Sequence, residues 1–322
     1  MVASPLSDCW SNERRFFELH GTLLDRSSKP FIGNNTVVQL SGPYGPAGFS
    51  TLADIKGGFR FKKVPAGMYI LTAFVPQVAR AKRTIEIGPS FADRKGRINM
   101  TLQMQPRPYR PGSYQVDAMQ LSIPETARDE FAKGQQRFST RDFSGAAGYF
   151  RRALDIAPQF SAAWFQLGLI ACQEQRFQQA ADHFREALKY SPENYMALLN
   201  LGGVLLAQRN AGEAAAVNER AVKARPDDAQ AQAQLGYSYL LLGRLEEAET
   251  HLKRTVSLDP ANYYYPQILL ADIYSQRGDN ASMVRELEEF LRLHPDSQKA
   301  RDVAQILDRL RSQMKKTETV CP

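Results

Sequence analysis

Two patterns of hydrophobic and polar positions divide the chain. Between residues 16 and 104, short segments alternate apolar and polar residues, and each is bounded by Gly, Pro, Asn or Asp. This period of two is typical of strands that bury one face. From about residue 124 onward the apolar positions recur at helical spacing instead. The sequence therefore predicts a multidomain β + α protein, with a β domain in front of an all-α array.

Alternating segments are numerous enough in the front part to build two packed sheets. The seven segments cover residues 16–25, 35–42, 48–54, 58–64, 67–75, 83–88 and 97–104. On two of them the alternation predicts the inward-facing residues, which are Phe59, Phe61, Val64, Tyr69, Leu71 and Ala73. We therefore expect an N-terminal seven-strand β-sandwich over residues 16–104.

Prolines mark a fixed period in the back part. Pro158, Pro192, Pro226 and Pro260 are spaced by 34 residues, and Pro295 follows after 35. Small residues recur at the same period where two helices must approach closely, at Gly134, Gly168, Gly202, Gly236 and Ala271. Large residues occupy equivalent places on the second helices, at Phe150, Phe184 and Leu252. A constant period of this length indicates stacked helix pairs that bury a continuous core.

The second repeat carries the most complete motif. Its residues are Trp164, Leu167, Gly168, Ala180, Phe184 and Pro192. This spacing resembles the tetratricopeptide repeat (TPR) family. The resemblance implies an all-α TPR superhelix over 124–295, with five repeats at about 127–160, 161–194, 195–228, 229–262 and 263–297. An amphipathic segment over 298–314 is expected to form a capping helix.

A stack of this kind presents the first helix of every repeat along a concave groove. The expected partner-binding residues on that face are Phe131, Gln135, Phe165, Leu169, Leu199, Leu206, Tyr237, Leu240 and Ile268. The face is mostly apolar and lacks the Lys, Arg and Asn set with which TPR proteins grip the acidic C-terminus of a chaperone. It favours an apolar peptide or protein ligand, with polar groups such as Gln166, Asn200 and Gln234 to bond its backbone. The alternatives are that the chain's own front domain fills the groove, or that a second copy does, which would make a homo-oligomer.

The front domain carries its own set of turn and core residues. They are Gly21 and Thr22, Pro30, Gly58, Phe59 and Phe61, and the corner Val64, Pro65, Ala66 and Gly67 before Tyr69. This set resembles the carboxypeptidase regulatory-like domain, a transthyretin-like sandwich. The resemblance implies a non-catalytic stabilising or adhesive module and a carbohydrate-binding-like fold. It opens an alternative function, a carbohydrate-binding or adhesion module in which Trp10, Tyr44 and Tyr109 stack on sugars.

Charge is unevenly distributed between the two parts. Residues 1–123 carry 16 Lys and Arg against 8 Asp and Glu, whereas the remaining residues carry 25 against 26. On the strand 58–64, Arg60, Lys62 and Lys63 are expected to face outward as a basic edge. Such an edge suits a polysaccharide or another anionic surface. Nucleic acid is disfavoured, because no RNA-binding aromatic signature or DNA-reading helix accompanies the basic clusters.

Catalytic and metal chemistry finds little support in the sequence. Three cysteines, Cys9, Cys172 and Cys321, are too scattered for a disulfide framework. His183 and Glu186 form an H-x-x-E string like that of zinc carboxypeptidases, with His251 as the obvious third ligand. Two repeats separate the histidines by more than about 10 Å, whereas zinc bonds are about 2 Å long. We therefore expect no metal, no cofactor and no enzyme activity.

Targeting signals are also absent from the sequence. It contains no apolar run long enough to cross a membrane and no leader among its first 20 residues. The paired resemblances suggest a bacterial protein of the periplasm or cell envelope, whereas the missing leader favours the cytoplasm. The rest of the chain is expected to form tails over 1–15 and 315–322 and a Pro-rich linker over 105–123. The predicted function is that of a non-enzymatic interaction scaffold whose basic sandwich anchors or orients it.

Overall fold

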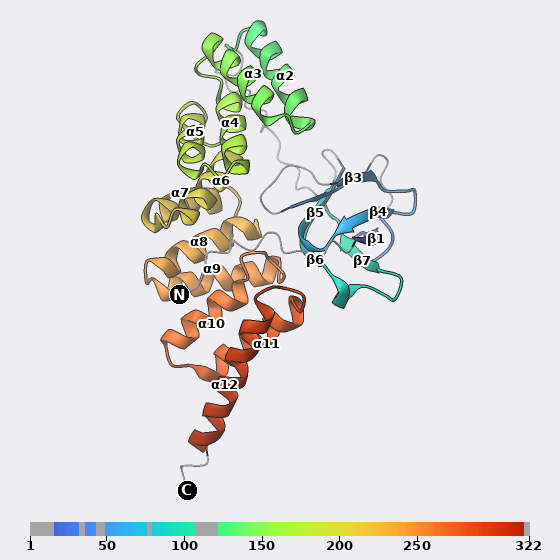
Figure 1. Ribbon diagram of the computed structural model, residues 1–322, viewed down its shortest axis with the longest axis vertical. Coiled ribbons are helices and arrows are strands. Elements are labelled where there is room, and N and C mark those ends of the chain that lie inside the picture. Colours follow the sequence, from blue (N-terminus) through green and yellow to red (C-terminus); the bar gives the residue numbers. More distant parts are fainter. Residues whose placement is uncertain (1–15, 32–35, 43–48, 76–78, 107–121, 319–322) are drawn as a thin grey trace. The chain divides into compact units, whose positions relative to one another are not determined.

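The computed structural model describes residues 16–31, 36–42, 49–75, 79–106 and 122–318. The chain divides into two compact units. One, which we call the sandwich unit, comprises Met1–Tyr109 and Leu245–Pro322, and the other, the repeat unit, is Arg110–Arg244. The predicted fold class is confirmed, because two β-sheets precede a TPR-like array of helices (Figure 1).

Several predicted features lie outside the described residues. They are the tail 1–15, the linker apart from residues 105, 106, 122 and 123, the last residues 319–322, the thiols of Cys9 and Cys321, and the aromatic residues Trp10, Tyr44 and Tyr109.

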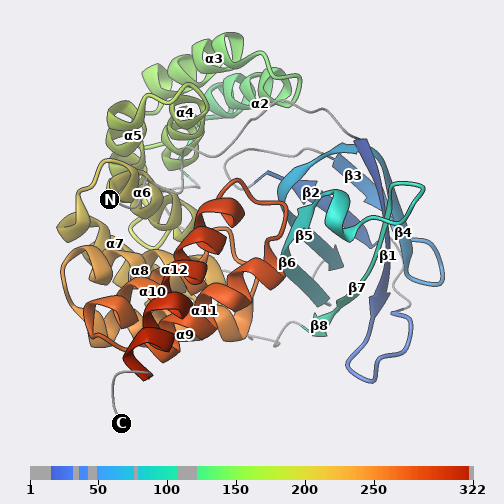
Figure 2. The same ribbon diagram turned by 60° about the horizontal axis from the view of Figure 1, so that its bottom comes forward.

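All seven predicted strands are present, and they form two sheets (Figure 2). The three-stranded sheet has the order β4-β1-β7 and consists of β1 (Phe16–Leu24), β4 (Gly58–Pro65) and β7 (Arg97–Gln103). The five-stranded sheet has the order β3-β2-β5-β6-β8 and consists of β2 (Val37–Ser41), β3 (Phe49–Leu52), β5 (Gly67–Val75), β6 (Ala79–Ile87) and the short β8 (Gln105–Pro106). Strand β1 runs antiparallel to β4 and parallel to β7.

The alternation in β4 breaks at a β-bulge. Phe59 and Phe61 are buried two residues apart, but the next buried residue, Val64, follows after three. The register explains this step, since Phe17 pairs with Val64 whereas Leu19 pairs with Phe61. Two lysines, Lys62 and Lys63, therefore lie opposite one residue of β1, and Lys63 takes a positive φ of 54°. The predicted inward residues form the core of the sandwich, with Tyr69 only partly buried.

Helices form pairs at the predicted period. In the repeat unit they are α2 (Glu125–Ser139), α3 (Phe143–Ile156), α4 (Ser161–Gln173), α5 (Phe177–Tyr190), α6 (Tyr195–Ala207), α7 (Ala211–Ala224) and α8 (Ala229–Leu241). In the sandwich unit they are α9 (Leu245–Leu258), α10 (Pro266–Gln276), α11 (Asn280–Leu293) and α12 (Ala300–Glu318), together with the 3₁₀ turn η2 (Pro89–Phe91). The segment expected to form a capping helix is α12.

Glycine on the first helix and phenylalanine on the second set the spacing within a pair. A Cβ atom on Gly134 would lie 2.6 Å from the ring of Phe150, and one on Gly168 would lie 2.5 Å from the ring of Phe184. Both rings are completely buried. Any larger residue at these glycines would therefore push the two helices apart.

The carbonyl groups of the regularly spaced repeat prolines also accept hydrogen bonds. The carbonyl oxygens of Pro158, Pro192, Pro226 and Pro260 accept hydrogen bonds of 2.6–2.8 Å from Trp164, Arg220, Gln232 and Gln267, in that order. Gln232 stands one repeat period after Leu198 and two after Trp164. A glutamine amide thus replaces the motif tryptophan as the donor that satisfies the turn carbonyl.

Candidate functional site

The predicted groove residues differ in accessibility along the array. We use the name first-helix face for the residues at the predicted i, i+4, i+7 spacing on α2, α4, α6 and α8. The partly or fully exposed members are Phe131, Gln135, Phe165 and Leu169, all on α2 and α4. The buried members are Leu199, Leu206, Tyr237 and Leu240, with 3%, 4%, 5% and 8% exposure. The accessible predicted members of this face therefore lie on α2 and α4.

The two phenylalanines of the face also pack into the array. The Phe131 ring lies 5.3 Å from the ring of Phe150 and 4.8 Å from that of Phe160. Phe165 repeats the first contact one period later, at 5.7 Å from Phe184. Each ring thus has one side fixed by the core and another that keeps accessible surface, which is a favourable geometry for an apolar anchor site.

Met196 belongs to the same surface and was not predicted. It follows the start of α6 and is 46% exposed, unlike most large apolar residues of the described chain. Cys172 lies near the end of α4, and burial raises the pKa of its thiol to about 12. Its thiol therefore stays protonated and acts as a small apolar group.

Amide side chains occupy one position of the first helix in three successive repeats. They are Gln166, Asn200 and Gln234. The Oε1 atoms of Gln166 and Gln234 are buried and accept no hydrogen bond from the described residues. The Nδ2 group of Asn200 donates to the carbonyl of Met196 in its own helix, at 2.8 Å. Gln234 is only 1% exposed, so its amide belongs to the interior, whereas Asn200 is partly exposed.

The ninth predicted residue, Ile268, lies in the sandwich unit. It is partly buried and packs against an apolar cluster that includes Tyr265, Phe290 and Leu307. Met68 of β5 packs against the same cluster. Ile268 therefore contributes to the attachment of the sandwich to the last helices as well as to the first-helix pattern.

A buried polar pair joins the sandwich to the last repeat. Nδ1 of His294, in the turn after α11, lies 3.0 Å from Oε2 of Glu86 on β6. The two side chains are 0% and 6% exposed. The imidazole also lies edge-on to Tyr265, with ring centroids 5.0 Å apart. This contact spans 208 residues of sequence, and no local pattern predicts it.

A second buried contact protects the edge of the five-stranded sheet. Strand β8 pairs only with Ala79 and Arg80, so the rest of β6 is an edge. There the backbone N–H of Thr84 donates to both carboxylate oxygens of Asp259, at 3.2 and 3.3 Å. Burial raises the pKa of Asp259, while the bonds from Thr84 and Asn262 act in the opposite direction. The turn after α9 thus covers an edge strand that would otherwise expose its amides.

A third contact attaches η2 to the turn after α11. The Asp296 carboxylate accepts hydrogen bonds from the backbone N–H and the hydroxyl of Ser90, at 2.9 and 2.6 Å. A Cβ atom on Gly88 would lie 2.4 Å from the Asp296 carboxylate, so a larger residue there would displace this side chain. The sandwich is therefore fastened to the ends of two successive repeats.

The sequence does contain a signal for this junction. Each repeat has one residue directly before its proline, and the series is Ala157, Ser191, Arg225, Asp259 and His294. Asp259 and His294 are both almost completely buried. A buried acid and a buried imidazole need polar partners, and the sandwich supplies them.

The three residues of the predicted basic edge differ in their contacts. The Arg60 guanidinium bonds to Oε2 of Glu18 at 2.6 Å, and this bond is the main cause that lowers the pKa of Glu18. Lys62 and Lys63 are exposed and form no ion pair with any residue that the structure describes. Two of the three predicted charges are therefore available at the bulge, whereas Arg60 is partly neutralised.

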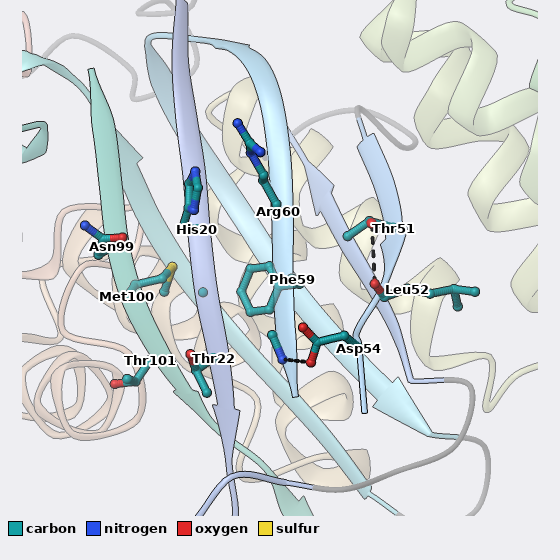
Figure 3. Close-up of a pocket in the computed structure, with 12 residues that line it drawn as sticks. His20, Thr22, Thr51, Leu52, Asp54, Phe59, Arg60, Asn99, Met100 and Thr101 are labelled. Carbon is teal, nitrogen blue, oxygen red and sulfur yellow. Dashed lines mark hydrogen bonds between the residues drawn. The ribbon is translucent and has the colours of Figure 1, made fainter. Parts of the chain in front are cut away.

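An open depression of about 800 Å³ lies on the face of the three-stranded sheet that carries Arg60 (Figure 3). Its lining includes Thr22 and Thr101, which are directly opposite in the register of β1 and β7, and His20, which is opposite Asn99. Phe59, which also lines it, is only 6% exposed, whereas Leu52 of β3 is 61% exposed. The depression is therefore polar apart from Leu52 and Met100, and the part of the chain described here gives it no exposed aromatic platform.

The described residues offer no site for a metal ion. They contain no group of three or more His, Cys, Asp or Glu side chains placed to hold one. No helix among them is both long and apolar enough to span a membrane. His183 instead lies against Trp164, with ring centroids 5.6 Å apart, and burial lowers its pKa.

Helix pairs with this period, glycine spacing and proline turn define a TPR-like protein. A family profile described as the middle TPR-like domain of cilia and flagella-associated protein 70 matches residues 130–294, just over half of the 322 residues. The chain belongs to this family of TPR-like domains. A search of curated proteins finds no match.

Solved structures show the same fold. The crystal structure of YrrB, described as a TPR protein with an unusual peptide-binding site, is 21% identical with a TM-score of 0.52 and covers 59% of this chain and 98% of its own. MamA 41-end from Desulfovibrio magneticus RS-1 is 22% identical with a TM-score of 0.50 and covers 55% of this chain and 99% of its own. At these identities the likeness concerns the fold alone.

Proposed function

We propose that the protein is a non-enzymatic scaffold that binds a polypeptide segment along the first-helix face of the repeat unit. The carrying observation is the accessible apolar surface that Phe131, Phe165 and Leu169 keep on two successive first helices. An extended or helical peptide with apolar side chains would fit such a surface. The relative YrrB, with its peptide-binding site, supports the same class of ligand.

Accessible apolar side chains set the expected character of that peptide. Phe131, Phe165, Leu169 and Met196 keep exposed surface on the accessible helices. None of them is charged, so the ligand should present apolar side chains to this face. The buried members Leu199, Leu206, Tyr237 and Leu240 shape the face from behind in this arrangement.

Selection from a displayed library of random peptides against the intact protein tests the proposal. Selected peptides should be apolar, and Leu169→Lys should reduce their binding about a hundredfold by placing a charge in an apolar contact. Ile156→Lys is the matched control, because Ile156 is 43% exposed at the end of α3 and away from the face. Equal loss in both variants, or no selected peptide at all, would reject the groove.

The sandwich serves in this proposal as the anchoring or orienting module. Its three contacts with the last repeats, through Glu86, Thr84 and Ser90, fix its direction relative to α10–α12. The resemblance of the front domain to carboxypeptidase regulatory-like domains supports this role, because those domains are often non-catalytic attachments. A module fastened in this way can hold the protein at a surface with its last repeats in a defined orientation.

A second candidate function is binding of an acidic polysaccharide in the depression on the three-stranded sheet. The observation that favours it is the set of side chains with no hydrogen-bond partner among the described residues, Thr22, Asn99 and Thr101, beside Arg60. Hydroxyl and amide groups next to a cation suit a ligand that carries hydroxyls and a carboxylate.

Titration of the intact protein with polygalacturonate and with uncharged dextran separates this candidate from the first. Binding should be specific to polygalacturonate, and Thr22→Val combined with Thr101→Val should weaken it at constant charge. Arg60→Gln should weaken it more than Lys62→Gln, which removes the same charge outside the depression. Absence of binding, or equal effects of the two charge changes, would remove this candidate.

A further inference from the structure

Two turns lie at one end of the sandwich, on either side of the last residues of β1. The first turn, Asp25–Pro30, follows β1, and the second, Ala53–Gly57, precedes β4. Leu23 at the end of β1 connects them, since its N–H donates to the carbonyl of Gly57 and its carbonyl accepts from the N–H of Phe31. The two turns therefore form one continuous surface, which we call the tip.

The same pattern of hydrogen bonds stabilises both turns of the tip. Oδ1 of Asp25 accepts hydrogen bonds from the backbone N–H groups of Ser27 and Lys29. Oδ1 of Asp54 accepts from those of Lys56 and Gly58 in the same pattern. One carboxylate oxygen of each aspartate therefore folds back onto its own turn and accepts backbone hydrogen bonds there.

The exposed side chains of the tip include two large apolar residues and three cations, together with Ser27, Ser28 and Asp54. Ile55 at the top of the second turn is 83% exposed, and Leu52 at the end of β3 is 61% exposed. They are the two most exposed large apolar residues that the structure describes. The same two turns carry three exposed cations, Arg26, Lys29 and Lys56, which form no ion pair with any described residue. Exposed apolar side chains on a rigid turn are uncommon unless they bind something.

We infer that the tip docks onto an anionic lipid surface, with Ile55 and Leu52 entering the interface and Arg26, Lys29 and Lys56 contacting lipid phosphates. This inference rests on the anchoring role proposed for the sandwich and supplies its target. Apolar residues that enter the headgroup boundary beside basic residues are the pattern of peripheral membrane binding. The carboxylates of Asp25 and Asp54 repel lipid phosphates. This repulsion is weakest when the carboxylates are hydrogen-bonded to the amides of their own turns.

The shape of the tip favours a membrane over a protein partner. A stable protein interface buries about 800 Å² on each partner and needs a broad complementary surface. Ile55 instead protrudes from a tight turn, and it is flanked by charges on both turns. A protruding apolar residue enters a deformable lipid interface without a matching pocket.

Co-sedimentation of the intact protein with lipid vesicles tests the inference. The probes are vesicles of phosphatidylcholine mixed with phosphatidylserine and vesicles of phosphatidylcholine alone. Binding should occur on the mixed vesicles and should fall with added salt. Ile55→Ser should weaken binding about tenfold, and Lys29→Gln and Lys56→Gln should weaken it about fivefold each.

Matched variants decide the outcome. Ile306→Ser removes an apolar residue of 39% exposure from α12, and Lys62→Gln removes an exposed cation from β4. Both should bind the mixed vesicles like the wild type. No binding by the wild type, or equal loss in these controls, would overturn the inference. Peptide binding should be unchanged in Ile55→Ser, so that failure of the tip and failure of the groove are distinguished.

Discussion

His294 and Glu86 form a hydrogen-bonded pair inside the sandwich unit, with 3.0 Å between Nδ1 and Oε2 and almost no exposure of either side chain. The Nε2 atom of His294 has no hydrogen-bond partner among the residues that the structure describes, so Glu86 provides the polar contact of the ring. The pair joins β6 to the turn after α11. It makes the sandwich part of the same folded unit as the last repeats rather than a separate domain on a linker.

Glu86→Ala should destabilise the sandwich unit by about 3 kcal/mol, because a buried imidazole loses its polar partner. Urea unfolding measures this change. Arg292→Gln is the control, since it breaks an ion pair with Glu289 on the exposed side of α11 and should leave the unfolding midpoint unchanged. A shift of similar size in both variants would show that the Glu86–His294 contact has no special role.

Asp259 should make the junction dependent on pH. Burial raises its pKa in the folded chain above the ordinary value of 3.8. Its contribution to stability is therefore full below that value and is lost as the pH rises through the folded pKa. Asp259→Asn, which cannot ionise, should gain stability relative to the wild type as the pH is raised from about 4. Urea unfolding at several pH values tests this, and a difference that shrinks with pH would contradict it.

Asp93 should show the opposite dependence and serves as an internal comparison. Hydrogen bonds from the backbone and side chain of Arg97 lower its pKa to about 2. Its contribution to stability is therefore present above the ordinary value of 3.8 and is lost as the pH falls toward 2. The difference between wild type and Asp93→Asn should be largest near neutral pH and should vanish in acid, as measured by the same unfolding series.

The periodicity of apolar residues predicted the helices and strands, because each type of element buries its side chains at a characteristic spacing. The 34-residue spacing located the helix pairs, and the alternation located all seven strands. The bulge was visible in the spacing of Phe61 and Val64, which is three residues where an even strand requires two. The spacing alone does not identify a bulge, because a bulge depends on the register with β1, which the sequence does not specify.

The sandwich junction could not be predicted in the same way. Thr84 and Asp259 are 175 residues apart, and their contact depends on how two folded elements meet. The sequence showed only that an acid and a histidine precede two of the five repeat prolines. Exposure along the groove could not be predicted from the sequence either. Phe165 and Tyr237 belong to the same face pattern, yet only Phe165 keeps accessible surface.

Asn218→Leu should stabilise the repeat unit by about 1–2 kcal/mol. Asn218 occupies the place of Phe184 one repeat later and is completely buried, with its Oδ1 unbonded and its Nδ2 bonded to Ser238. Ser238 keeps its bond to the carbonyl of Gln234 after the change. Phe184→Leu at the equivalent position should instead lose about 1 kcal/mol. Urea midpoints that move in the same direction would contradict this account.

Gly168→Ala should destabilise the repeat unit by about 1–3 kcal/mol, because its new methyl group would overlap the Phe184 ring. Gly148→Ala is the matched change on α3, where nothing lies within 4 Å of the added methyl. It should gain about 0.5–1 kcal/mol from lower backbone entropy in the unfolded chain. Thermal unfolding of both variants measures the difference, and two losses of equal size would show that the glycine position is not set by the ring.

Photo-crosslinking from the first-helix face tests the central claim most directly. A photoreactive phenylalanine analogue replaces Leu169 in the intact protein, and in a second variant it replaces Ile156. Cells that make either variant are illuminated, and mass spectrometry then identifies the peptide attached to the inserted residue. We expect the same apolar polypeptide segment at position 169 in repeated experiments and none at position 156. No attached segment at 169, or the same segment at both positions, would contradict the account.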